Sequence, residues 1–217
     1  MVLDFIDAGQ YFDPLRFGFE IAYSIVIMSL FYFIYYKASK MSALTSHEGI
    51  KYFKLAFLFF TLAYFTRLIH HLVRLLTFTT DINITGSTLA MSSLIVITYF
   101  SSLAIGYLIY SNLWKEINHK EFLAITHLFI LITLTVFMIN YSIWFLVIVQ
   151  IMLMTILILI SKKKIRYVYA LISLFWIINL IIVYSRRFII FEVKIILQII
   201  SLAIILYFIY KMLKWIR

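Results

Sequence analysis

Residues 122–160 read FLAITHLFILITLTVFMI, NYS and IWFLVIVQIMLMTILILI, so two apolar runs are separated only by Asn140, Tyr141 and Ser142. Each run has about the length of one helical membrane crossing, which takes roughly 20 residues. A connection this short joins antiparallel neighbours. The stretch therefore predicts a helical hairpin that crosses a membrane twice, with its turn at the membrane surface.

The remainder of the chain has the same apolar character. Of its 217 residues, 65% are hydrophobic and 13% are charged, whereas a soluble domain has about 45–50% apolar and about 25% charged residues. We predict seven spans, at residues 19–36, 52–78, 89–113, 122–139, 143–160, 167–184 and 188–213. Residues 1–18 mix acidic and aromatic side chains, and we expect them to lie in the membrane interface, a disordered tail being the alternative. The sequence thus predicts an all-α membrane protein, a seven-transmembrane-helix bundle that forms one domain over residues 1–217.

The distribution of basic residues predicts the orientation of this bundle. The first, third and fifth connections and the C-terminal tail hold thirteen Lys and Arg residues and three Glu residues, whereas the opposite side holds six basic and six acidic residues. Because basic loops stay in the cytoplasm, we predict an outer N-terminus and a cytoplasmic C-terminus in a multi-pass protein of the cell membrane. The densest basic run is Lys162, Lys163, Lys164 and Arg166. We expect it to fix this topology, the alternative being that it binds anionic lipid headgroups or an acidic partner.

Composition and motifs exclude or disfavour several functions. The chain has no cysteine, which excludes disulfides, thiolate metal sites and cysteine nucleophiles. Its net charge of +10 falls in short loops, so we expect no nucleic-acid surface. With five glycines and one proline, the spans should be unbroken helices, which disfavours a broken-helix carrier. We find no catalytic or metal-binding motif, and we expect no enzymatic activity, no metal and no cofactor.

The second span contains the residues that we predict to form a ligand site. It holds Arg67, His70, His71 and Arg74, and an ionisable side chain at bilayer depth costs about 2.5–3.5 kcal/mol. At helical spacing these four side chains project within about a third of the helix circumference. Guanidinium groups bind anions through paired hydrogen bonds, and histidine adds a titratable donor. The pattern predicts an anion pocket that opens toward the outer side.

Polar residues on other spans are candidates to face this stripe. They are Glu20 on the first span, Asn179 on the sixth and Gln198 on the seventh. On the seventh span, Lys194, Gln198 and Ser201 share one helix face at helical spacing. We therefore expect two polar stripes, on the second and seventh spans, inside the bundle.

A purely structural interpretation of the same residues is the alternative. In it, Arg67 pairs with an acid such as Glu20 and stabilises the bundle, while Arg74 extends to the outer headgroups. For Gln150, on the fifth span, and Asn140, at the end of the fourth, we expect hydrogen bonds between helices and no further role.

One part of the chain resembles a known group of proteins. The stretch Gly49-Ile50-Lys51-Tyr52-Phe53-Lys54 is followed by Phe57-Leu58-Phe59-Phe60 and by Ala63-Tyr64-Phe65-Thr66-Arg67. Together with the seven-span layout, this pattern resembles stand-alone seven-helix membrane modules of archaea and bacteria, which are similar to the N-terminal sensor regions of some histidine kinases. The resemblance implies a sensor architecture and identifies no ligand.

These observations lead to one preferred function and its alternatives. We expect a non-enzymatic receptor or sensor-like protein that binds an anionic or lipid-like ligand in an outer-leaflet pocket. Its expected partners are the lipid bilayer, this ligand and a cytoplasmic or membrane protein that receives the signal. A small transporter or channel is the first alternative, and it would need a hydrated path that continues inward past Phe60. A structural subunit of a membrane complex is the second, and a membrane enzyme acting on lipid ranks last.

Overall fold

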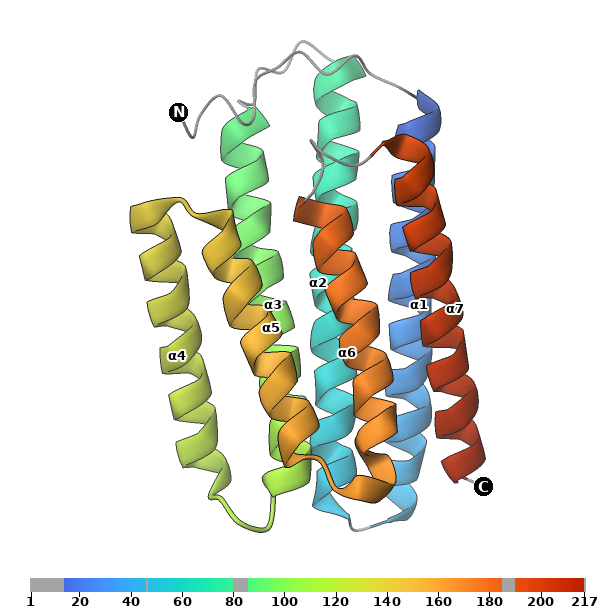
Figure 1. The fold of residues 1–217 in the computed structure, drawn as a ribbon, viewed down its shortest axis with the longest axis vertical. Coiled ribbons are helices and arrows are strands. Elements are labelled where there is room, and N and C mark those ends of the chain that lie inside the picture. Colours follow the sequence, from blue (N-terminus) through green and yellow to red (C-terminus); the bar gives the residue numbers. More distant parts are fainter. Residues whose placement is uncertain (1–13, 46, 80–85, 185–189, 217) are drawn as a thin grey trace.

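The computed structural model describes residues 14–45, 47–79, 86–184 and 190–216, and within these ranges every regular element is a helix. The seven helices, shown in Figure 1, are α1 (Pro14–Leu44), α2 (Glu48–Thr79), α3 (Gly86–Leu113), α4 (His119–Asn140), α5 (Ile143–Ile160), α6 (Lys163–Tyr184) and α7 (Phe191–Ile216). Each is long and apolar enough to cross a membrane. The prediction of an all-α bundle with seven candidate spans is confirmed, and its orientation in the membrane stays a prediction.

Most helices extend beyond the predicted spans. The helix α5 has the same bounds as its predicted span, whereas α1 begins five residues earlier and ends eight residues later than the predicted 19–36. Helical hydrogen bonds are made within the chain, so a helix continues into the polar region outside the hydrocarbon. Residues 14–18, which we expected to lie in the interface, form the start of α1, with Pro14 as its first residue. Residues 1–13 lie outside the described residues.

The hairpin between α4 and α5 has the expected tight connection. Tyr141 caps α4 in the left-handed conformation, with φ of 49°, and its N–H donates to the carbonyl of Phe137 at 2.7 Å. Ser142 then precedes α5. Two residues therefore suffice to reverse the chain.

Six helices form a closed ring, and α4 lies outside it. Around the ring, α1 packs on α2, α2 on α3, α3 on α5, α5 on α6, α6 on α7, and α7 on α1, while α4 packs on α3 and α5. Since the number of spans is odd, the first turn of α1 and the last turn of α7 lie at opposite ends of the bundle (Figure 1). The ring encloses an interior to which all six of its helices can contribute side chains.

Aromatic side chains fill the part of this interior nearer the predicted inner side. Phe31, Phe57, Phe60, Phe175 and Phe208 come from four different helices and are almost completely buried. The ring centroids of Phe31 and Phe60 are 5.2 Å apart, and those of Phe57 and Phe208 are 5.6 Å apart. Packing of this density leaves a solid aromatic layer across α1, α2, α6 and α7.

A separate hydrogen-bonded chain joins α3, α5 and α6. The Gln150 amide donates to Ser101 Oγ at 2.8 Å and accepts from the Trp176 indole N–H at 2.7 Å. All three side chains are buried. The prediction that Gln150 makes hydrogen bonds between helices is confirmed, and the same contact explains why Trp176 can be buried inside the bundle.

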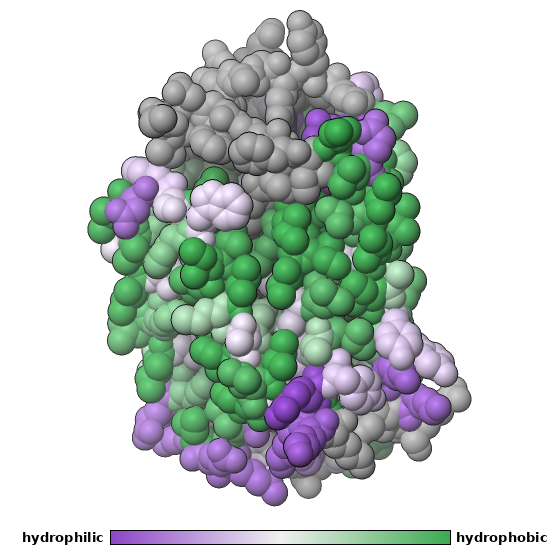
Figure 2. Space-filling view, viewed as in Figure 1, coloured by the Kyte–Doolittle hydropathy of each residue, from purple (hydrophilic) through white to green (hydrophobic). Residues whose placement is uncertain are grey.

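The outer surface has the character of a membrane protein. Figure 2 shows a broad band of apolar side chains and, below it, hydrophilic side chains at the end where α7 finishes. Lys37 lies over the ring of Phe33, Lys40 over Tyr36 and Lys211 over Tyr207, at 4.7–5.5 Å from the ring centroids. Such pairs suit the boundary between headgroups and hydrocarbon.

The predicted basic run lies at this same end. At the start of α6, three of its side chains are exposed: Lys162, Lys163 and Arg166. The Lys164 side chain is not among those that the structure describes. The Arg166 guanidinium donates to the carbonyl of Ser161 at 3.1 and 3.2 Å, which caps α5 with a positive charge.

Gly49 allows the first turn of α2 to approach the last turn of α3, and we expect Gly49→Ala to lower the free energy of unfolding by roughly 1–3 kcal/mol. A Cβ at this position would lie 2.9 Å from the carbonyl oxygen of Ser111 and 3.0 Å from the Trp114 ring. The backbone oxygen cannot yield without moving α3. Chemical unfolding in detergent micelles measures the difference.

Gly18→Ala is the matched control, because a Cβ there meets no atom within 4 Å. We expect this variant to be unchanged or more stable by about 0.5–1 kcal/mol. If Gly49→Ala and Gly18→Ala have the same free energy of unfolding, the close approach of α2 and α3 is contradicted.

Candidate functional site

The two predicted polar stripes face each other inside the ring. Arg67 and His71 on α2, and Lys194, Gln198 and Ser201 on α7, are all at most 7% exposed. Glu20 and Asn179, predicted to face them from α1 and α6, are 8% and 3% exposed. The interior accepts these groups because exposing them to hydrocarbon would cost more.

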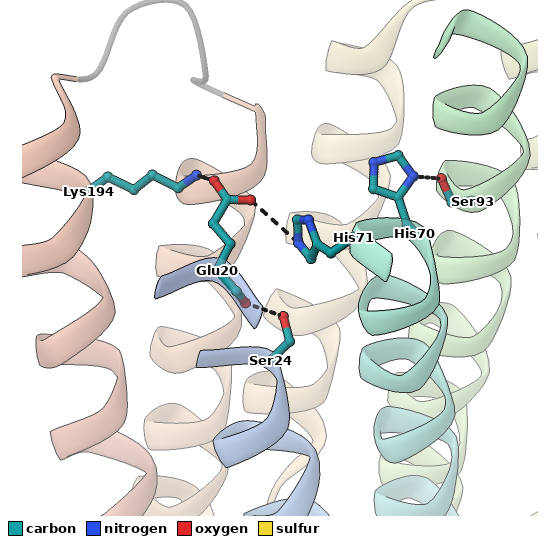
Figure 3. Close-up of polar contacts among 6 residues, drawn as sticks. All are labelled: Glu20, Ser24, His70, His71, Ser93 and Lys194. Atoms are coloured by element: carbon teal, nitrogen blue, oxygen red, sulfur yellow. Dashed lines mark hydrogen bonds and ion pairs between the residues drawn. The ribbon is translucent and has the colours of Figure 1, made fainter. Parts of the chain in front are cut away.

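Glu20 is the centre of an ionic cluster near the predicted outer end, drawn in Figure 3. Its carboxylate forms an ion pair with the Lys194 ammonium on one side. On the other side it lies 3.4 Å from His71 Nε2. Ser24 Oγ donates to the Glu20 main-chain carbonyl at 2.8 Å. One carboxylate therefore connects α1 to both α7 and α2.

A neutral hydrogen-bonded cluster involves the next turn of α1. The hydroxyls of Tyr23 and Tyr64 both donate to Asn179 Oδ1, each at 2.7 Å. The Tyr23 hydroxyl also lies 2.5 Å from Ser201 Oγ. Asn179 Nδ2 donates within α6 to the carbonyl of Phe175 at 2.9 Å. A single side-chain carbonyl thereby joins α1, α2 and α6.

Arg67 lies against the two tyrosines of this cluster. Its guanidinium carbon is 5.6 Å from the ring centroid of Tyr23 and 5.8 Å from that of Tyr64, and the side chain is 7% exposed. No carboxylate among the described residues forms an ion pair with it. The pairing of Arg67 with Glu20, which the structural alternative named, is not present: Lys194 and His71 lie at that carboxylate instead. That Arg67 has a purely structural role stays a prediction.

Gln198 is placed between the two contacts that join α7 to α1. Lys194, one turn before it, pairs with Glu20, and Ser201, one turn after it, contacts Tyr23. The Gln198 side chain is 6% exposed. Its amide nitrogen Nε2 has no hydrogen-bond partner in the part of the chain that the structure describes.

His70 and Arg74 do not join this arrangement. His70 Nδ1 lies 2.8 Å from Ser93 Oγ, so this ring is directed toward α3 while His71 is directed toward α1 (Figure 3). Arg74, two turns beyond Arg67, is half-buried. Of the seven predicted site residues, the structure brings together Glu20, Arg67, His71, Asn179 and Gln198.

Sequence reasoning missed the two tyrosines. Tyr23 comes three residues after Glu20, and Tyr64 comes three residues before Arg67, so each shares a helix face with a residue already singled out. That spacing was the available signal. Lys194 and Ser201 were recognised as part of a stripe without a role, and the structure gives each a partner on α1.

The depth of Arg67 follows from helix geometry. It comes 13 residues after Lys54, which lies at the basic end of α2, so the rise between them is about 20 Å. The hydrocarbon core is about 30 Å thick. With Lys54 at the predicted inner boundary, we expect Arg67 roughly two thirds of the way across. The layer of Phe57 and Phe60 lies between Arg67 and the basic end.

The described ranges contain no group of three or more His, Asp or Glu side chains placed to hold a metal ion.

Comparison with known proteins gives one informative match. An uncharacterised protein from Archaeoglobus fulgidus is 27% identical to this chain, over 93% of this chain and 94% of that protein. No family model matches the chain, and no solved structure does. The resemblance to histidine-kinase sensor regions therefore stays a prediction. The similarity to the archaeal protein extends over nearly the full length of both chains, so it is not confined to one helix pair.

Proposed function

We propose that this protein is a non-enzymatic seven-helix membrane receptor or sensor, which binds an anionic or lipid-like ligand at Arg67 in the predicted outer half of the bundle. The observation that carries the proposal is the buried guanidinium of Arg67, which has no carboxylate partner among the described residues. A buried charge of this kind is stable only when it is compensated. A ligand anion supplies that compensation.

The surrounding charges favour an anion over a cation. Glu20 pairs with Lys194 and also lies against His71, whereas the positive charge of Arg67 has no carboxylate partner among the described residues. Its environment is formed by tyrosine rings and helices, where electrostatic interactions are stronger than in water. Hydrogen bonds between guanidinium and an oxyanion are among the strong ones, and they are often bidentate. The ligand's acceptor oxygens would bind the Arg67 fork beside Tyr23 and Tyr64.

The position of the site among the helices suits signal transfer. Residues around Arg67 come from α1, α2, α6 and α7, so an anion would contact several elements at once. A ligand shifts an equilibrium only as far as it binds one helix arrangement better than another. A change in the ring would reach the basic end of the bundle, where Lys162, Lys163, Lys164 and Arg166 would meet an acidic partner or anionic headgroups.

Transport is the alternative that requires a continuous path. Such a path would run from Arg67 inward past Phe60, where the buried rings of Phe31, Phe57 and Trp176 contact Phe60. This packing argues against a permanently open channel. It favours a binding site that is closed on the inner side.

We expect anions or anionic lipids to raise the thermal stability of the purified protein, and we expect Arg67→Gln to abolish this effect. A ligand at about 100 times its dissociation constant stabilises by about 2.7 kcal/mol, which is a shift of several degrees in the melting temperature. Intrinsic fluorescence of the four tryptophans follows unfolding during a screen of salts and lipid-doped micelles.

Arg166→Gln is the control, because it removes a guanidinium at the opposite end of the bundle. The ligand-free Arg67→Gln protein should be at least as stable as wild type, since a buried charge is lost. A double variant, Arg67→Ala with Arg74→Ala, tests the whole predicted arginine pair. An unchanged response to every anion and lipid in these variants would remove the proposal.

A further inference from the structure

Two groups near Tyr23 carry hydrogen-bond donors that suit an anion. The first is the Arg67 guanidinium, which lies over the Tyr23 ring and has no carboxylate partner among the described residues. The second is Gln198 Nε2, which belongs to a side chain that is only 6% exposed and has no partner in the described ranges. A buried donor left unmatched costs about 1–3 kcal/mol. A fold that keeps such a group calls for an explanation.

The placement of Gln198 associates it with the Arg67 site. The Tyr23 hydroxyl contacts Ser201 Oγ at 2.5 Å, and Ser201 Oγ in turn donates to the Gln198 main-chain carbonyl at 2.9 Å. The Arg67 guanidinium lies over the Tyr23 ring, and the Tyr23 hydroxyl contacts Ser201, which lies one turn after Gln198 on α7. The Arg67 guanidinium and the unmatched amide of Gln198 therefore both belong to the part of the interior around Tyr23.

The other polar groups of this region are already engaged with each other. The hydroxyls of Tyr23 and Tyr64 donate to Asn179, and the Asn179 amide donates to Phe175. Lys194 pairs with Glu20. His71 lies against the same carboxylate, with Nε2 at 3.4 Å. The Arg67 guanidinium and Gln198 Nε2 are donors, so a complementary ligand brings acceptor oxygens to them.

The charge of the ligand follows from the same inventory. Arg67 is the one buried cation of the described interior that has no carboxylate partner. A singly charged anion would neutralise it. A doubly charged anion would leave a net negative charge at bilayer depth, where an uncompensated charge costs about 2.5–3.5 kcal/mol.

From these observations, and resting on the proposed function of Arg67, we infer that the site takes a singly charged oxyanion with two acceptor oxygens, one toward the Arg67 guanidinium and one toward Gln198 Nε2. A carboxylate and a phosphodiester both have this chemistry. Sulfate and a doubly ionised phosphate monoester do not. The group can belong to a small soluble acid or to a lipid.

Direct binding measurements on the full-length protein in nanodiscs of neutral lipid test this inference. The probes are hexanoate, oleate and phosphatidylglycerol as singly charged groups, and sulfate and phosphatidic acid as probes that can carry a second charge. We expect at least one singly charged probe to bind about tenfold or more tighter than both of the others, which corresponds to about 1.4 kcal/mol. If oleate or phosphatidylglycerol binds and hexanoate does not, the ligand is a lipid. If hexanoate binds, the ligand is a soluble acid.

Gln198→Met tests the second donor. We expect it to weaken binding of the preferred probe about tenfold or more, the loss of one hydrogen bond to a charged group. The same change should raise the melting temperature of the ligand-free protein, because the unmatched donor is gone while the volume is kept. Gln198→Glu, which replaces the donor by a negative charge, should abolish binding.

Gln150→Met is the matched comparison, since Gln150 is a buried glutamine whose amide is fully engaged with Ser101 and Trp176. It should lower the melting temperature and leave the affinity unchanged. If an anion binds through Arg67 equally well in Gln198→Met, or if sulfate binds more tightly, the inference about the ligand is overturned and the proposed function stands. If no probe or other anion binds at all, both are overturned.

Discussion

Glu20→Ala is expected to lower the free energy of unfolding by about 3–5 kcal/mol, the usual cost of removing one partner of a buried ion pair. Lys194 is 4% exposed, and the change removes the carboxylate that it contacts. The same carboxylate lies 3.4 Å from His71 Nε2. The substitution therefore removes one contact of α1 with α7 and one contact of α1 with α2. Chemical unfolding in mixed micelles, followed by tryptophan fluorescence, measures the effect.

Two further variants separate the ion pair from a general effect of losing an acid. Glu192→Ala removes an exposed glutamate in the first turn of α7, and such surface changes stay within about 0.5 kcal/mol. The double variant Glu20→Gln with Lys194→Met removes both charges and should recover most of the stability, because a neutral pair of similar volume carries no buried charge. A Glu20→Ala protein as stable as Glu192→Ala would show that this pair does not hold the bundle together.

Phe60→Ala is expected to have the second largest effect, a destabilisation of about 3 kcal/mol. Phe60 is completely buried, and its ring contacts Phe31 at 5.2 Å and Trp176 at 4.9 Å between centroids. In soluble cores this substitution costs about 3–5 kcal/mol. We expect the lower end, because helix association in a membrane depends on packing and has little hydrophobic driving force.

Phe65→Ala is the control on the same helix, since Phe65 is 47% exposed and lipid can replace its contacts. This variant should remain close to wild type. Liposome flux assays on the same proteins test the transport alternative. Wild-type protein that conducts ions or small anions without gating would contradict the closed aromatic layer, and a Phe60→Ala protein as stable as Phe65→Ala would contradict the packing itself.

The positions of the helices were largely predictable, because hydropathy is a local property. The prediction for α5 has the observed bounds. Of the three residues predicted to separate α4 from α5, Tyr141 and Ser142 form the connection and Asn140 is the last residue of α4. The length of α1 was underestimated, because its polar ends continue the helix beyond the apolar run. No local pattern marks where a helix stops once it leaves the hydrocarbon.

The interior polar faces were also predictable, for a physical reason that acts on each helix separately. Arg67, Lys194 and Gln198 lie inside the ring, because lipid cannot solvate them and helical spacing assigns them to one face. His70 was grouped with His71, yet the two rings are directed toward different neighbours. Adjacent residues differ by about 100° around a helix, and the stripe was wide enough to meet both α1 and α3.

What the amino-acid sequence determined by itself is the number of helices, their approximate ends and the side of each that avoids lipid, since all three follow from the free energy of placing single side chains in hydrocarbon. The tertiary structure alone decided which polar groups meet. Glu20 pairs with Lys194, 174 residues away, and not with Arg67, because the way α1 packs against α7 in the ring places these two side chains together. That choice leaves the Arg67 guanidinium and the Gln198 amide with hydrogen bonds to offer, and on those two donors the proposed ligand site depends.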